Sequence, residues 1–143
     1  MSLVQIVGGT VFDAIHGEVV RNGVVCIEDD RITTVGPAAT IATGGRDARV
    51  IDAAGQFVMP GMMDCHVHLL SSGAADYATR GLKELLPYTA IRGAANAKLM
   101  LDMGFTTVRD VGAMGYGNIA LRQAIEDGLV PGPRVYAPVR AVR

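Results

Sequence analysis

The sequence predicts an α/β fold in which a small β module is followed by alternating strands and helices. Half of the 143 residues are hydrophobic, 18 are glycine and few are aromatic, a composition typical of an α/β protein. Short apolar segments separated by tight turns fill residues 1–56. From residue 57 onwards, segments of strand character alternate with helical periodicity, which is the pattern of parallel βαβ units.

Residues 1–56 are predicted to form a small antiparallel β module. Asn22-Gly23 predicts a two-residue hairpin turn, because both residues tolerate the positive φ angles that such turns require. Asp29-Asp30 predicts a second turn. His16 lies in a polar turn segment and is expected at the surface. The expected strands are Leu3–Val7, Val19–Val20, Val24–Ile27, Arg31–Val35 and Arg49–Asp52.

The region after residue 57 is predicted to begin with a strand and a helix. The apolar segment Gln56–Met59 is expected to be a buried strand. Pro87 can open the helix because proline is tolerated in a first turn, and Gly104 is suited to end it. Apolar residues recur between them at spacings of three and four, as in an amphipathic helix: Tyr88, Ile91, Ala95, Leu99 and Met103.

A strand, a second helix and a third strand are predicted to follow. Phe105–Val111 is dense in β-branched residues, which favours a strand. Asn118 can cap a helix that ends near Gly128. A Pro-Gly-Pro turn then precedes the expected strand Arg134–Val139. Strand, helix, strand, helix, strand implies parallel strands joined by right-handed crossovers.

The segment Asp64-Cys65-His66-Val67-His68 carries the most informative functional pattern. Alternate side chains of an extended segment share a face, so Asp64, His66 and His68 are expected to point the same way. Two neutral imidazoles held this close suit a divalent transition metal. The end of an apolar strand is also where parallel α/β architectures keep their chemistry. The alternative is that both histidines are packed or surface residues without a metal.

Three neighbouring residues have less specific interpretations. Asp64 is expected to support a histidine, and the alternative is a hydrogen-bonding residue deeper in the fold, below the site. Arg109 and Asp110 lie toward the carboxyl end of their predicted strand, facing a possible site. A structural ion pair or contacts that fix the following loop are favoured for them over a catalytic role. No catalytic residue is assigned in this chain.

Charge and cysteine content narrow the class of protein. The formal net charge is −1 and the 13 basic residues are scattered, so no nucleic-acid or membrane partner is expected. Cys26 and Cys65 form no Cys-x-x-Cys pair, which fits a reducing compartment. No apolar run approaches the ~20 residues of a transmembrane helix. The N-terminus also lacks the pattern of a signal peptide, and a cytoplasmic location is expected.

The chain resembles the amidohydrolase superfamily of metal-dependent hydrolases. Asn22–Ile32 is similar to the N-terminal β-sandwich of that superfamily, and Val50–His68 is similar to the start of its barrel with the first metal motif. Three later segments resemble the branch of imidazolonepropionase-like amidohydrolases and Xaa-Pro, Xaa-Arg and Xaa-Lys dipeptidases: Gly104–Gly112, Leu121-Arg122 and Gly132–Val135. The resemblance covers the N-terminal portion of a full-length member.

This resemblance implies a fold, a division into domains and a cofactor. The fold is α/β, a small β-sandwich module followed by the first βα units of a TIM-type (β/α)8 barrel, apparently truncated. Residues 1–56 would be part of the β-sandwich domain, and residues 57–143 the first three strands and two helices of the barrel. His66 and His68 would bind the more buried metal. Zn²⁺ is the expected ion, with one or two divalent metals in a complete protein.

The resemblance also implies an activity, and it leaves alternatives open. The expected reaction is hydrolysis of an amide or peptide C–N bond by a metal-activated water, with a small-molecule amide or dipeptide as substrate. Dipeptidase-like activity is favoured, while deaminase or cyclic-amidase chemistry and assembly as a homo-oligomer stay open. A second hypothesis is a truncated, non-catalytic chain, since two histidines fall short of the roughly three protein ligands of a catalytic zinc.

Overall fold

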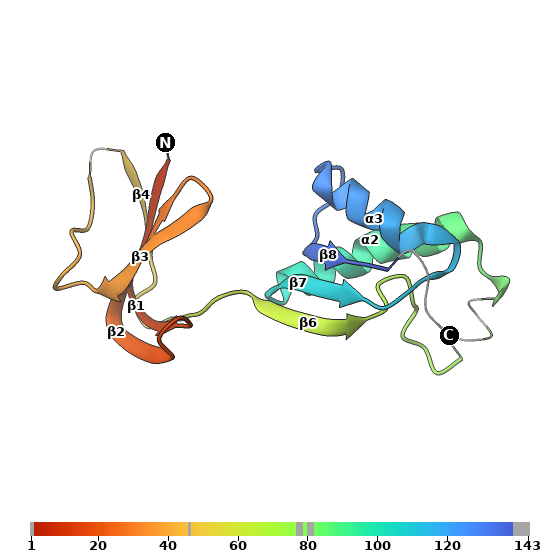
Figure 1. The fold of residues 1–143 in the computed structure, drawn as a ribbon, viewed down its shortest axis with the longest axis horizontal. Coiled ribbons are helices and arrows are strands. Elements are labelled where there is room, and N and C mark those ends of the chain that lie inside the picture. The colour runs from red at the N-terminus through yellow and green to blue at the C-terminus, as the bar shows by residue number, and fades with distance from the viewer. Residues whose placement is uncertain (1, 46, 77–78, 80–81, 139–143) are drawn as a thin grey trace. The chain divides into compact units, whose positions relative to one another are not determined.

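The chain is divided into two compact units in its computed structural model, which describes residues 2–45, 47–76, 79 and 82–138 (Figure 1). The units are Met1–Pro60 and Gly61–Arg143. The first contains β1 (Leu3–Asp13), β2 (Glu18–Glu28), β3 (Arg31–Pro37), β4 (Ala48–Asp52) and β5 (Phe57–Val58). The second contains β6 (Met62–Val67), α2 (Leu86–Asp102), β7 (Phe105–Asp110), the short 3-10 helix η1 (Met114–Tyr116), α3 (Gly117–Glu126) and β8 (Arg134–Tyr136).

The first unit is a mixed sheet, so the expectation of a purely antiparallel module is wrong. Its strands lie in the order β3-β2-β1-β4, and β5 also pairs with β1. β1, β2 and β3 are antiparallel neighbours, whereas β4 and β5 run parallel to β1. The long connection between β3 and β4 makes this possible, because a parallel neighbour requires a crossover rather than a tight turn.

The segment Gln56–Met59 does not form the predicted strand in front of the histidines. Phe57–Val58 pairs with Thr10 and Val11 of β1 and therefore belongs to the first unit. The strand that carries the histidines is Met62–Val67 itself. The boundary between the compact units accordingly falls after Pro60, whereas the sequence placed it after residue 56.

Asn22-Gly23 forms a β-bulge and not the predicted hairpin. β2 runs without a break from Glu18 to Glu28, and Asn22 has a φ of 46° within it. Gly9 pairs with Gly23 and Val11 with Val20, so two steps along β1 face three along β2. The positive φ that suits a hairpin turn is used here to accommodate the extra residue. The Asp29-Asp30 turn between β2 and β3 is confirmed.

His16 lies at the surface of the first unit, as predicted. Its side chain is 68% exposed, and its Nδ1 lies 2.7 Å from Oδ2 of Asp13. This hydrogen bond raises the pKa of His16 and lowers the pKa of Asp13. The pair therefore stabilises the folded state at pH values between the pKa of Asp13 and the pKa of His16. Its contribution is lost as the pH rises through the raised pKa of His16 or falls through the lowered pKa of Asp13.

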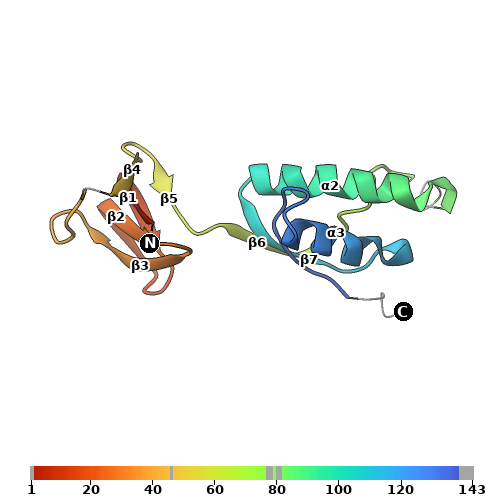
Figure 2. The same cartoon turned by 90° about the horizontal axis from the view of Figure 1, so that it is seen from above.

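The second unit is a parallel sheet in the order β6-β7-β8 with two helices packed on it (Figure 2). α2 contacts β7 and α3, and α3 contacts β8. The buried core joins these elements to the segment after β6: Leu69, Leu70, Ala97, Val108, Leu121 and Val135. Within the described part of the chain, no helix has the length and apolar character needed to cross a membrane.

The first predicted helix is confirmed, but its expected apolar residues do not face the core. Pro87 stands in the first turn of α2, and Gly104 follows its end with a φ of +91°. Tyr88, Ile91, Leu99 and Met103 are between 56% and 71% exposed. The buried positions are Gly93 and Ala97. Small residues lie there because a Cβ on Gly93 would stand only 3.0 Å from Cδ1 of Leu70.

The second predicted helix is confirmed, but Asn118 does not cap it. The N-cap of α3 is Tyr116, which has a φ of 59°. Asn118 lies inside the helix and is 1% exposed, and its amide nitrogen points to Asp110 and to the carbonyl of Pro138. β8 is confirmed over Arg134–Tyr136, while the predicted end of that strand at Val139 lies outside the described residues.

Replacing Leu121 by alanine should destabilise the second unit by about 2–5 kcal/mol, because the substitution empties a packed position in its core. Leu121 is 4% exposed, whereas Leu129 is 75% exposed and provides the matched control. Leu129→Ala should change the free energy of unfolding by less than about 0.5 kcal/mol. Urea unfolding followed by circular dichroism measures both effects. Equal losses in the two variants would contradict this account of the core.

Candidate metal centre

His66 and His68 lie at the carboxyl end of β6, next to the carboxyl end of β7. His66 is the penultimate residue of the strand, and His68 directly follows its final residue, Val67. The backbone N–H of Val111 donates to the carbonyl of Val67 at 3.0 Å, which holds the two strand ends together. The residues that follow β7 are thereby brought beside His68, although more than 40 residues separate them along the chain.

An irregularity in β6 separates Asp64 from the histidines. Asp64 pairs with Val108 and Val67 with Asp110, so three steps along β6 face two along β7. The alternation that predicted a common face for Asp64, His66 and His68 is interrupted between Asp64 and Val67. Oδ1 of Asp64 accepts a hydrogen bond of 3.0 Å from the backbone N–H of His66. Asp64 therefore supports His66 through the backbone and not through the imidazole.

The two imidazole rings lie close enough to share one metal ion. Their centroids are 5.6 Å apart and their planes are inclined by 77°. Zinc binds a histidine nitrogen at about 2.0–2.1 Å and thus lies roughly 3 Å from the ring centre. Two rings on one ion consequently have centroids within about 6 Å of each other. The histidine pair meets this condition, and both residues are exposed rather than packed into the core.

His68 is held by one ring nitrogen in a way that suits a metal ligand. Its Nδ1 lies 3.1 Å from the carbonyl oxygen of Gly112. A carbonyl oxygen can only accept, so Nδ1 carries the hydrogen and the neutral ring keeps its lone pair on Nε2. Metal-binding histidines characteristically donate their second ring nitrogen to a carbonyl or carboxylate in this manner. Nε2 of His68 is therefore the nitrogen prepared for a metal.

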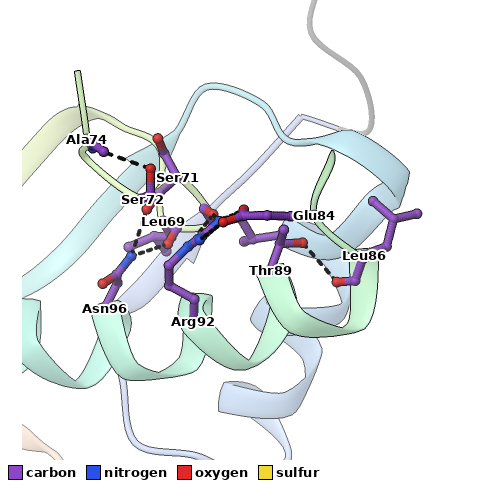
Figure 3. Close-up of polar contacts among 10 residues, drawn as sticks. Leu69, Ser71, Ser72, Ala74, Glu84, Leu86, Thr89, Arg92 and Asn96 are labelled. Atoms are coloured by element: carbon purple, nitrogen blue, oxygen red, sulfur yellow. Dashed lines mark hydrogen bonds and ion pairs between the residues drawn. The ribbon is translucent and has the colours of Figure 1, made fainter. Parts of the chain in front are cut away.

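The backbone that follows His68 is tied to α2 by Asn96 (Figure 3). The side-chain amide of Asn96 donates to the carbonyl of Leu69 at 2.7 Å and to the carbonyl of Ser71 at 3.1 Å. The N–H of Ser71 in turn donates to the carbonyl of His68 at 3.0 Å. These bonds satisfy peptide groups that no longer have a strand partner, and they define the direction in which the chain leaves His68.

Arg92, one helical turn before Asn96, holds the next peptide group. Its Nη2 and Nε donate to the carbonyl of Leu70 at 2.8 and 3.1 Å. Nη1 and Nη2 also pair with the carboxylate of Glu84 at 2.8 and 2.5 Å, and this pairing raises the pKa of Arg92 (Figure 3). A guanidinium matches a carboxylate in two bonds at once, which orients it toward Leu70 as well.

Asp110 has the loop-fixing role that the sequence favoured over a catalytic one. It is fully buried, and its carboxyl oxygens accept hydrogen bonds from the backbone N–H groups of Leu69 and Gly112. Arg109, the preceding residue, is exposed and so lies on the opposite side of β7. The two residues therefore do not face a common site.

Sequence reasoning missed Arg92 and Asn96. The predicted helix gives neither residue a role, because helical periodicity in a single sequence identifies apolar faces only. One feature of the sequence could have indicated them. The two polar residues are four positions apart, on one face of the helix, and Gly93, which has no side chain, lies between them in the sequence. The small residues of α2 mark its packed side, and the polar residues beside them reach the backbone after β6.

The described residues supply two histidines to the candidate site but no larger cluster of ligands. Across residues 2–45, 47–76, 79 and 82–138, no group of three or more His, Cys, Asp or Glu side chains is placed to hold a metal ion. One hollow of the second unit borders His68, at the edge of β6. It is lined by Val67, His68, Leu69, Ser71, Ser72, Gly73, Asn96, Leu99 and Met100.

Comparisons with known proteins identify the family. The sequence model of the Amidohydrolase family matches residues 57–141, more than half of the chain and most of the second unit. The chain therefore belongs to the amidohydrolase family, as the histidine motif indicated. Members of this superfamily are typically metal-dependent. The β module followed by parallel β/α units is likewise the N-terminal arrangement of amidohydrolase structures.

Individual relatives differ in their activities. An imidazolonepropionase of Ralstonia nicotianae is 32% identical over 114 residues, covering 80% of this chain and 24% of the relative. A prolidase crystallised with N-methylphosphonate-L-proline is 35% identical, with a TM-score of 0.80 over 95% of this chain and 31% of that one. A Xaa-Pro dipeptidase with methionine in its active site is 29% identical, with a TM-score of 0.83 over 99% and 34%. The chain thus spans about a quarter to a third of these relatives.

His68 is expected to be the Nδ1–H tautomer in the neutral, metal-free protein, because the carbonyl of Gly112 accepts a hydrogen bond at that nitrogen. Long-range ¹H–¹⁵N correlation spectra of histidine-labelled protein distinguish the two tautomers. His68→Ala assigns the signals by removing one set. An Nε2–H tautomer at His68 would contradict the arrangement described here.

Proposed function

We propose that this chain is the N-terminal part of a metal-dependent amidohydrolase that hydrolyses an amide or peptide C–N bond in a small substrate, in the manner of a dipeptidase. The observation that carries the proposal is the histidine pair at the end of β6, with His68 held at Nδ1 and its other nitrogen left for a metal. The likeness to a prolidase crystallised with N-methylphosphonate-L-proline supports a dipeptide as the substrate.

His66 and His68 are proposed to hold the metal through their ring nitrogens, with Zn²⁺ as the ion. When bound, such an ion supplies a water of lowered pKa, about 7, and polarises the scissile carbonyl. The chain's own residues orient the site: Gly112 fixes the tautomer of His68, and Asp64 holds the backbone of His66. We propose that residues on further strands of the barrel supply the remaining metal ligands, the ligands of any second metal, and the general base.

The two compact units are proposed to be part of a β-sandwich domain and the first three strands and two helices of a (β/α)8 barrel. The proposed partner is a small-molecule amide or dipeptide, without nucleic acid or membrane, and the location is cytoplasmic.

The runner-up function is a cyclic-amide hydrolase or deaminase of the same superfamily. The similarity to an imidazolonepropionase favours it, and that relative matches 80% of this chain. The two proposals share the histidine pair. The fold alone cannot separate them, because substrates are selected by the site and not by the architecture.

Alanine in place of His66 or His68 should remove most of the bound metal and the hydrolytic activity. Loss of an outer hydrogen-bonding partner typically weakens metal binding about 10–100-fold, and loss of a direct ligand should exceed this. Metal content by mass spectrometry and zinc affinity by competition with a chelator measure the effect, in protein expressed from the complete reading frame. His16→Ala is the matched control, because His16 lies at the surface of the first unit. Unchanged metal content in His66→Ala and His68→Ala would refute the proposal.

A substrate panel should separate the dipeptidase from its runner-up. We expect the metal-loaded protein to release proline, arginine or lysine from Xaa-Pro, Xaa-Arg or Xaa-Lys dipeptides with a higher kcat/KM than for cyclic imidazolones or aminopurines. Amino-acid analysis and ultraviolet absorbance follow the two kinds of reaction. Preference for the cyclic substrates would favour the runner-up. Stoichiometric metal without turnover of any compound would instead favour the non-catalytic hypothesis.

A further inference from the structure

We propose that Asp110 is a positioning residue for His68, one that sets the orientation and tautomer of the imidazole through the backbone without touching it. This inference rests on the proposed function, in which His68 binds the metal. It adds a residue that lies on a different strand, 42 positions further along the chain. Asp110 does not face the open side of the sheet, so it is not offered as a ligand or a catalytic residue.

The Asp110 carboxyl group is fully buried and accepts hydrogen bonds from three donors. Oδ2 accepts from the backbone N–H of Leu69 at 2.8 Å. Oδ1 accepts from the backbone N–H of Gly112 at 2.9 Å and from the Asn118 side chain at 3.4 Å. A buried carboxyl group is costly unless it is hydrogen-bonded, so its placement here fixes the groups that donate to it.

Two of these donors belong to residues that are bonded to His68. Leu69 is the residue bonded to His68 along the chain, and its N–H belongs to the peptide group that carries the carbonyl of His68. Gly112 provides the carbonyl that accepts the hydrogen of His68 Nδ1. One carboxyl group therefore fixes both the backbone from which the ring extends and the acceptor to which the ring is bonded.

The conformation of Gly112 explains why its N–H needs to be held. Gly112 has a φ of 139°, in the range that side chains rarely adopt, so its peptide plane is not set by ordinary backbone preferences. The bond from its N–H to Asp110 fixes the residue, and its carbonyl is then held 3.1 Å from His68 Nδ1. Without that bond, the ring of His68 would lose its fixed acceptor and could exchange tautomers.

The next peptide group, between Leu69 and Leu70, is held independently by α2. Asn96 donates to the carbonyl of Leu69, while Asp110 accepts from its N–H. Asn118→Ala therefore gives a useful buried control, because it removes the longest bond to Asp110 and leaves those from Leu69 and Gly112 in place. Asp127→Asn is the exposed control for loss of a carboxylate in the same unit.

The test compares Asp110→Asn with these controls in protein expressed from the complete reading frame. Asparagine has nearly the same shape but presents one amide donor where Asp110 accepts, so it opposes an N–H group. We expect the Nδ1–H signal of metal-free His68 to give way to a mixture of tautomers. Zinc affinity, measured by chelator competition, should fall about 10–100-fold. Asn118→Ala and Asp127→Asn should keep the tautomer and affinity of the unaltered protein.

The outcomes separate this inference from the proposed function. If His68→Ala loses zinc but Asp110→Asn keeps both the tautomer and the affinity, Asp110 serves the fold alone and the inference is overturned. If neither His66→Ala nor His68→Ala loses zinc, the proposed function fails. A tautomer shift in Asp110→Asn would even then support the positioning of His68, because that readout needs no metal.

A second variant covers the case in which Asp110→Asn does not fold. Replacing Leu69 by its α-hydroxy acid turns the donating N–H into an ester oxygen and removes a single hydrogen bond to Asp110. We expect the same direction of change, with weaker zinc binding and a mixed His68 tautomer. An unaltered tautomer and affinity in this folded variant would overturn the inference.

Discussion

A chain that leaves a parallel strand must find new partners for peptide groups that the sheet no longer satisfies. Here that requirement falls on Leu69, Leu70 and Ser71, directly after the histidine motif. Side chains provide the partners: Asp110 from β7 accepts, while Arg92 and Asn96 from α2 donate. The same bonds tie α2 to the end of β6, so the packing of the helix and the direction of His68 depend on one another.

Close packing of small residues makes these bonds possible. Gly93 and Ala97 bring α2 near the sheet, and Gly117 leaves room for Leu70, whose Cδ2 would lie 2.3 Å from any Cβ at that position. Leu70 thus packs between α2 and α3, while its carbonyl is held by Arg92. A larger side chain at Gly93 or Gly117 would push the helices away and stretch the bonds beside His68.

Membership of the amidohydrolase family connects the histidine pair at the end of β6 with metal-dependent hydrolysis. The family match covers the unit that carries the histidine pair. Relatives that are similar to this chain nevertheless include an imidazolonepropionase and a prolidase. The ion and its first two ligands are the common part of the proposed mechanism, because activation of a water serves every one of these hydrolyses. Substrate choice is set by the groups of the site and not by the architecture.

Local signals in the sequence were sufficient for both helices, β7 and β8 of the second unit and for recognising the histidine motif. β-branched residues predicted β7, Pro87 and Gly104 bounded α2, and the spacing of His66 and His68 indicated a metal site. Each of these signals depends on residues that are close together along the chain, such as a fixed φ, a capping glycine or the alternation of a strand. Family membership was predictable for the same reason.

The tertiary structure decided what depends on distant partners. It made β4 and β5 parallel to β1 and buried the small residues of α2 rather than its large apolar ones. It also brought the Asp110 carboxyl group to the N–H of Leu69, 41 residues away, and the carbonyl of Gly112 to Nδ1 of His68, 44 residues away. The sequence by itself determined which side chains are available to bind a metal. Only the tertiary structure determined which way His68 is held, because the carboxyl group of Asp110 lies at the end of another strand and the acceptor, Gly112, follows that strand.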